Sequence, residues 1–95
     1  MIVSFSDKAT EELFQSGSAA PKKIPGDIRA RILRKLTLID SATRIDDLMV
    51  PPSNRLHKLD GNRAGQYSVS VNMQWRICFR FQDGDAYDVE FCDYH

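Results

Sequence analysis

Residues 67–92 read YSVSVNMQWRICFRFQDGDAYDVEFC, and the alternation of apolar and polar side chains in this stretch indicates the fold. Tyr67, Val69 and Val71 alternate with serines, and the runs 75–81 and 87–91 repeat the pattern with aromatic and β-branched residues. A period of two is typical of strands that bury one face. Three such runs joined by short turns predict a three-stranded antiparallel meander.

The turn between the last two runs carries a constraint, because residues that face each other across an antiparallel pair point to the same side. A two-residue turn at Asp83-Gly84 would pair Phe79 with Asp88 and would leave Val89 on the wrong face. We therefore expect a three-residue loop or a bulge around Gly84. The polar face of the sheet then carries Ser68, Ser70, Arg76, Arg80, Asp88 and Glu90, with Arg80 in a surface ion pair with one of the two acids.

A short strand and a first helix are expected before the meander. Residues 1–5 alternate in the manner of a strand. In Ser6-Asp7 we expect the Ser6 hydroxyl to cap the following helix, and Gly17 ends that helix.

A second, longer helix is expected to open at Pro25 and Asp27, after a loop over residues 18–24. Its apolar stripe runs from Ile28 to Ile39 with helical spacing. The pattern as a whole predicts a single α+β domain over residues 1–95, ordered strand–helix–helix and then three strands, with both helices on one face of the sheet.

Charge is unevenly distributed, although the formal net charge is zero. Residues 21–63 carry ten Lys and Arg against five Asp, a net of +5, whereas both ends are acidic. A basic segment of this kind can meet a phosphate backbone or can be a solvated helix face, and both readings stay open. The two cysteines lack a CxxC motif, which excludes a zinc site and a disulfide framework. No signal-peptide or membrane-spanning pattern is present, so we expect a cytoplasmic protein with reduced thiols and no membrane association.

The tripeptide Asp93-Tyr94-His95 follows the last predicted strand. These groups can bind or transfer protons beside an anchored strand, or they can fray as a solvated tail. Arg76 opens the preceding strand, and antiparallel pairing would bring that end beside the tripeptide. A permanently charged, forked donor in this position suits a phosphoryl centre. His57, before the meander, is either structural or part of the same site.

The stretch 56–68, the run Asn72-Met73-Gln74-Trp75-Arg76 and the ending 89–95 resemble the HigB branch of the RelE superfamily, the toxins of bacterial type II toxin–antitoxin pairs. Residues 2–5 and 39–48 match the same branch, so the resemblance covers nearly the whole chain. It implies a RelE-like fold and an endoribonuclease that cleaves mRNA in the ribosomal A site with the RNA's own 2′-hydroxyl, without a metal or another cofactor. It also implies a helix-turn-helix, HigA-like antitoxin as partner, and operator DNA bound only through that antitoxin.

Carried over position by position, the resemblance implies catalytic roles for His57, Arg76, Asp93, Tyr94 and His95. Arg76 would bind the scissile phosphate, and the two histidines are candidates for proton transfer. Asp93 would orient a histidine or act as base, and Tyr94 would stack on a base or hold a phosphate oxygen.

One position departs from the family pattern. Some relatives carry a lysine where this chain has Asp60, and an acid there opposes phosphate binding. Lys58 or Arg63 would substitute as RNA-binding cations. The departure keeps an alternative open, namely an attenuated or non-catalytic module that binds an antitoxin or a ribosomal factor. A ribonuclease that cuts naked RNA without ribosomes is a third possibility.

Overall fold

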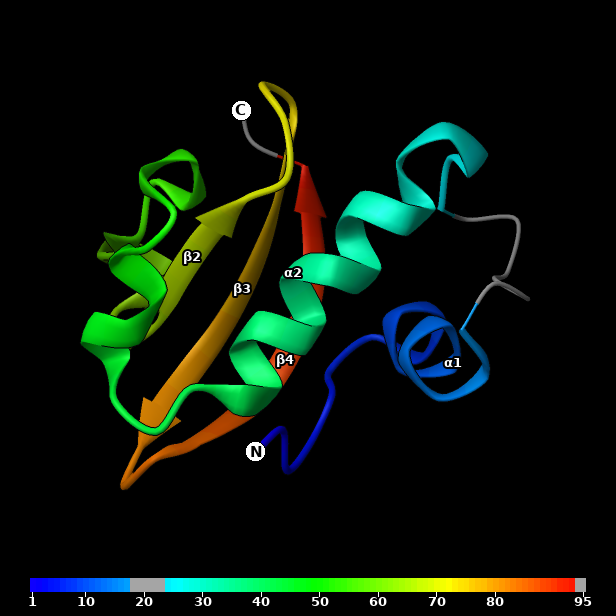
Figure 1. The fold of residues 1–95 in the computed structure, drawn as a ribbon. Coiled ribbons are helices and arrows are strands. Elements are labelled where there is room, and N and C mark those ends of the chain that lie inside the picture. The colour runs from blue at the N-terminus through cyan, green and yellow to red at the C-terminus, as the bar shows by residue number, and fades with distance from the viewer. Residues whose placement is uncertain (18–23, 94–95) are drawn as a thin grey trace.

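The computed structural model describes residues 1–17 and 24–93 and confirms the α+β architecture (Figure 1). Helices α1 (Lys8–Ser16) and α2 (Arg29–Ser41) precede an antiparallel sheet of four strands, β1 (His57–Lys58), β2 (Tyr67–Ser70), β3 (Trp75–Gln82) and β4 (Asp85–Asp93), which lie in that order. Short 3₁₀ turns occupy the connections at η1 (Gly26–Ile28), η2 (Ile45–Met49), η3 (Pro52–Asn54) and η4 (Gly61–Arg63). The meander is the predicted one, with β1 as an added edge strand that the sequence pattern did not reveal.

Both helices pack on one face of the sheet, and α2 runs across it in Figure 1. The apolar stripe of α2 meets the apolar sides of the strands because a helical period and a strand period each expose one hydrophobic face. Each fully buried aliphatic or aromatic side chain stabilises the fold by about 1.5–3 kcal/mol. The fully buried centre of this core includes Leu13, Ile32, Leu36, Ile39, Val69, Ile77, Phe79 and Val89.

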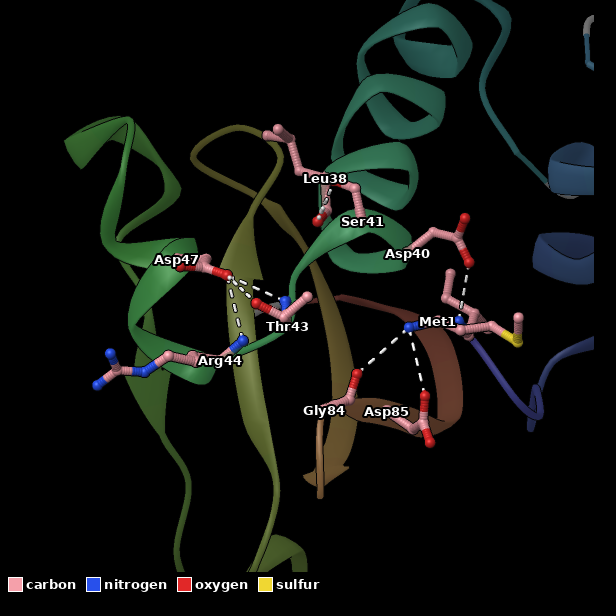
Figure 2. Close-up of polar contacts among 10 residues, drawn as sticks. Met1, Leu38, Asp40, Ser41, Thr43, Arg44, Asp47, Gly84 and Asp85 are labelled. Atoms are coloured by element: carbon pink, nitrogen blue, oxygen red, sulfur yellow. Dashed lines mark hydrogen bonds and ion pairs between the residues drawn. The ribbon is translucent and has the colours of Figure 1, made fainter.

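The predicted strand at residues 1–5 is not formed. This segment runs parallel to β4 and makes only isolated bridges to it, from Ile2 to Ala86 and from Phe5 to Val89. The first residue is tied down by polar contacts, and Figure 2 shows its ammonium group donating to the carbonyl oxygen of Gly84 at 3.3 Å. The segment keeps one register with β4 across both bridges, but it forms no regular strand ladder.

The helix starts also differ from the prediction. Asp7, and not Ser6, caps α1, since its carboxylate accepts the Ala9 N–H at 3.1 Å. A negative charge there also complements the helix dipole, which a hydroxyl cannot do. α2 begins at Arg29, after the 3₁₀ turn η1, instead of at Pro25. Of the loop predicted at 18–24, residues 18–23 lie outside the described residues.

A loop or bulge that keeps Val89 on the core face was expected around Gly84. The register of β3 and β4 shows the extra residue at a different place. The connection is the simple turn Asp83-Gly84, so a three-residue loop is not used. The bulge lies further along β4, which has one residue more than β3 in this interval, and Asp88 takes a φ of 54° there. The bulge returns Val89 to the core. The predicted surface ion pair joins Arg80 to Asp88 at 3.4 Å.

Candidate functional site

The polar face of the sheet holds a cavity of about 200 Å³ near the start of β3 and the end of β4. Two strand pairs, Trp75 with Asp93 and Arg76 with Cys92, bring these ends together. The start of β3 therefore lies beside the end of β4, as antiparallel pairing predicts, and Asp93 pairs with Trp75, the residue before Arg76. The cavity is lined by Leu59, Arg63, Ser68, Arg76, Cys78, Cys92 and Asp93.

Arg76 is the most buried charged residue of this cavity, with 8% of its surface exposed. Its Nε–H donates to the hydroxyl oxygen of Ser68 at 2.7 Å, and Nη2 donates to the backbone carbonyl oxygen of Arg55 at 2.9 Å. A buried charge is tolerated only when it is hydrogen-bonded or paired. The guanidinium is consequently presented to the cavity in a defined orientation, as an anion-binding group requires.

Arg63 supplies a second cation to the cavity wall from the short turn η4. Its Nη2 forms an ion pair with Oε1 of Glu90, and its Nη1 donates to the amide oxygen of Gln66 at 3.0 Å. Burial is the largest single influence and works against the charged form, but the hydrogen bond to Glu90 and the charge interactions with Cys92, Cys78 and Glu90 together raise the pKa of Arg63. The cavity therefore carries two arginines, Arg76 with the Ser68 hydroxyl and the Arg55 carbonyl among its acceptors and Arg63 paired with the Glu90 carboxylate.

Two thiols form part of the same wall. Cys78 is buried and Cys92 is half-buried, and their side chains contact each other across β3 and β4. A hydrogen bond from Cys92 lowers the pKa of Cys78, with a smaller contribution in the same direction from Arg63. The same contact, together with burial, raises the pKa of Cys92. Sequence inspection assigned no role to either cysteine at this site.

His57 lies on the same face as the cavity but is not among its lining residues. It pairs with Ser68, which pairs with Cys78, so these side chains form one row across the sheet. The histidine side chain is exposed at the edge of that row. Lys58 pairs with Tyr67 and points to the opposite side, where it is solvent-exposed, and the structure does not bring it to the cavity.

The two last predicted site residues, Tyr94 and His95, lie outside the described residues. Asp60 precedes η4 and is exposed, away from the cavity lining. Ser68 and the carbonyl group of Arg55 are the functional groups that sequence reasoning missed. The alternation of side chains along β2 could have pointed to Ser68, because Ser68 and Arg76 lie on the same face of the sheet. No sequence signal marks a backbone carbonyl.

Residues 1–17 and 24–93 contain neither a metal-binding cluster nor a membrane-spanning helix. No group of three or more His, Cys, Asp or Glu side chains is arranged so that it could hold a metal ion. None of the helices in this part of the chain is long and apolar enough to cross a membrane.

Comparison with known proteins places this fold and cavity in context. The protein named Endoribonuclease HigB from Proteus vulgaris is 40% identical over 95 residues, which is the full length of both chains. The protein named Toxin HigB-1 from Vibrio cholerae is 37% identical over 86 residues, 90% of each chain.

Among solved structures, the YoeB–YefM complex from Staphylococcus aureus contains a chain with a similar fold. The TM-score is 0.61 at 25% identity, and the match covers all of this chain and 95% of the other. The family model described as RelE-like toxin of type II toxin–antitoxin system HigB matches residues 3–95. The chain therefore belongs to the HigB-like family of RelE-like toxins.

Proposed function

We propose that this toxin is a ribosome-dependent endoribonuclease that cleaves mRNA in the A site and so inhibits translation and growth, acting as one domain over residues 1–95. The observation that carries the proposal is the buried, oriented guanidinium of Arg76 at a cavity it shares with Asp93. The name of the full-length Proteus vulgaris relative supports the same activity.

The proposed reaction is an internal transesterification of the RNA. The 2′-oxygen attacks the adjacent phosphorus and the bond to the 5′-oxygen breaks, which yields a 2′,3′-cyclic phosphate and a 5′-hydroxyl. A base removes the 2′-proton and an acid supplies a proton to the leaving 5′-oxygen. No metal or other cofactor takes part in this scheme, because the nucleophile is contained in the substrate.

Arg76 binds the non-bridging oxygens of the scissile phosphate, and its interaction strengthens as negative charge builds there. Preorganised donors of this kind are worth about 10²–10³-fold in rate. Arg63 contributes a second positive charge from the cavity wall, and Lys58 remains a predicted RNA contact outside it.

Proton transfer is assigned to His57, His95 and Asp93, and Tyr94 is assigned to a nucleobase or a phosphate oxygen. Among the described residues of this set, Asp93 lines the cavity. General acid–base catalysis contributes roughly 10²–10⁴-fold. Positioning of the 2′-hydroxyl, in part by the ribosome, supplies much of the remaining acceleration.

The proposed partners are an antitoxin of the helix-turn-helix, HigA-like class, the ribosome and mRNA, with operator DNA reached through the antitoxin. The description of the matching family, a toxin of a type II toxin–antitoxin system, and the YoeB–YefM complex among the solved structures support an antitoxin partner. Coexpression with a neighbouring helix-turn-helix gene should restore growth of cells that are arrested by the toxin.

Primer extension on one transcript, with and without translating ribosomes, tests the proposed activity. We expect new 5′ ends within codons on the translated transcript and none on the naked one. Cuts on both would identify a free ribonuclease. Growth arrest without any cuts would instead favour the binding module that acts through an antitoxin or a ribosomal factor.

A further inference from the structure

We propose that Ser68, together with the backbone carbonyl of Arg55, is a positioning residue for Arg76. Both groups act on the Nε/Nη2 edge of the guanidinium and so determine where its remaining donors meet the phosphate. The inference rests on the proposed function, in which Arg76 acts on the scissile phosphate.

The contact of Ser68 with Arg76 is short and fully enclosed. Ser68 has no exposed surface, and its hydroxyl oxygen lies 2.7 Å from Nε of Arg76. Hydrogen bonds to an ionised donor are stronger than those between neutral groups, and a low local dielectric strengthens them further. Removing this hydroxyl would take away the acceptor of the Nε–H in a buried position.

The second acceptor fixes the plane of the group. Nη2 of Arg76 lies 2.9 Å from the carbonyl oxygen of Arg55, which belongs to the loop after η3. Nε and Nη2 lie on one edge of the planar guanidinium, so two acceptors on that edge oppose both rotation and tilt. A strand hydroxyl and a loop carbonyl together give this geometry.

The residue before the loop carbonyl is anchored by its buried side-chain amide. Asn54 is 1% exposed, and its Nδ2 donates to the carbonyl oxygens of Leu48 at 3.1 Å and Val50 at 3.4 Å. Its Oδ1 accepts from Nζ of Lys35 on α2 at 2.6 Å. The next residue, Arg55, takes a left-handed conformation with φ 46° and ψ 51°, which turns its carbonyl toward Arg76. The helix layer is thereby connected to the site.

The test is a double-mutant cycle of Ser68→Ala with Arg76→Lys, measured as single-turnover cleavage of mRNA on programmed ribosomes. In lysine a methylene occupies the place of Nε, so the Nε–H that Ser68 accepts is absent. In the protein that keeps Arg76, we expect Ser68→Ala to lower the cleavage rate about 10–100-fold. This is the range seen when a group that orients a functional ligand is lost. In the Arg76→Lys background, the same change should lower the cleavage rate less than about threefold.

The cycle separates positioning from a general structural role. The proposal is overturned if Ser68→Ala lowers the cleavage rate equally in both backgrounds, or if it leaves the rate unchanged in the protein that keeps Arg76. Ribosome affinity should stay within about twofold of wild type, so that the effect falls on kcat rather than on KM.

Ser70→Ala is the matched control. Ser70 lies on the same strand and face and is the direct cross-strand partner of Arg76, yet its hydroxyl donates to the carbonyl oxygen of Asn72 at 2.9 Å. Its removal should change the cleavage rate less than about twofold, because it does not touch the guanidinium. A loss as large as that of Ser68→Ala would contradict the assignment.

Two further measurements test the proposal even if the Ser68→Ala protein does not fold or the wild type does not cleave RNA. Ser68→Thr keeps the acceptor oxygen and should retain activity, whereas Ser68→Cys offers only a weak acceptor and should not; equal rates would overturn the proposal. Independently of activity, the Nε–H of Arg76 should give a slowly exchanging NMR signal that persists in Ser68→Thr and is lost in Ser68→Cys. A fast-exchanging signal in the wild type would contradict the positioning role even if the ribonuclease function itself fails.

Discussion

Arg63, on η4, and Glu90, on β4, form an ion pair beside the cavity that also contains Arg76. The carboxylate thus neutralises one of the two cations that an incoming phosphate would meet. Both side chains keep contact with solvent, at 41% and 25% exposure, so the pair is worth at most about 1 kcal/mol. An anion of sufficient charge can therefore displace Glu90 from Arg63.

Glu90→Gln should release Arg63 and increase RNA affinity by a few-fold. The change removes a negative charge near the phosphate site, and the gain should shrink as salt screens the charges. Binding of a non-cleavable RNA, measured by fluorescence anisotropy at two salt concentrations, checks this. Asp88→Asn, which removes an acid paired with Arg80 away from the cavity lining, serves as control. Unchanged or weaker binding by Glu90→Gln would mean that Arg63 does not meet the RNA.

Alkylation of Cys92 should block the cavity and inhibit cleavage. The thiol is half-buried in the cavity wall, and a carbamidomethyl group would occupy part of its 200 Å³. Because the pKa of Cys92 is raised, the reaction should be slow at neutral pH and should accelerate as the pH rises above the ordinary thiol range. Mass spectrometry and residual activity report the outcome. Cys92→Ser should keep activity under the same treatment, and an inhibited Cys92→Ser protein would place the sensitive group elsewhere.

Phe79→Ala should lower the free energy of unfolding by about 3–5 kcal/mol, because Phe79 is the largest fully buried side chain of the core. Urea denaturation followed by tryptophan fluorescence measures the change. Met73→Ala is the matched control, since Met73 is 94% exposed and its loss should cost less than about 0.5 kcal/mol. Similar midpoints for the two variants would show that the core lies elsewhere.

Asp47 should make stability depend on acid pH. Figure 2 shows its carboxylate accepting the backbone N–H groups of Thr43 at 3.0 Å and Arg44 at 3.1 Å, and these bonds lower the pKa of Asp47. A carboxyl whose pKa is depressed by folding contributes stability that is fully present above its unfolded pKa and is lost as the pH falls through the folded value. Asp47→Asn should therefore lower Tm at pH 7, with a difference that shrinks below about pH 4. A Tm difference that does not vary with pH would contradict this.

The main elements of the fold could be predicted because their signals are local. Alternation through Tyr67–Val71 and Trp75–Phe81 predicted the strands, and the antiparallel rule placed Arg76 beside Asp93. The positions of the bulge and of the N-terminal segment could not be predicted, because they depend on how β4 fits the core. For α1, Ser6 and Asp7 are both good caps by type, and the choice depends on backbone geometry that the sequence does not display.

The candidate site was predictable only in part, for a related reason. Arg76 and Asp93 follow from strand pairing, and Arg63 was singled out by its charge. The acceptors that hold Arg76 come from a strand serine and from the carbonyl of Arg55, a residue 21 positions away in sequence. A long-range contact to the backbone depends on the packed loop and leaves no residue-type signature.

The most direct test of the account compares Arg76→Ala with Arg80→Ala in single-turnover cleavage of mRNA on programmed ribosomes. Both arginines lie on β3, but Arg80 is exposed, is paired with Asp88 and does not line the cavity. We predict that Arg76→Ala lowers the cleavage rate at least about 10²-fold while Arg80→Ala changes it less than about threefold. Equal rates for the folded Arg76→Ala protein and the wild type would contradict the assignment of Arg76 to the scissile phosphate.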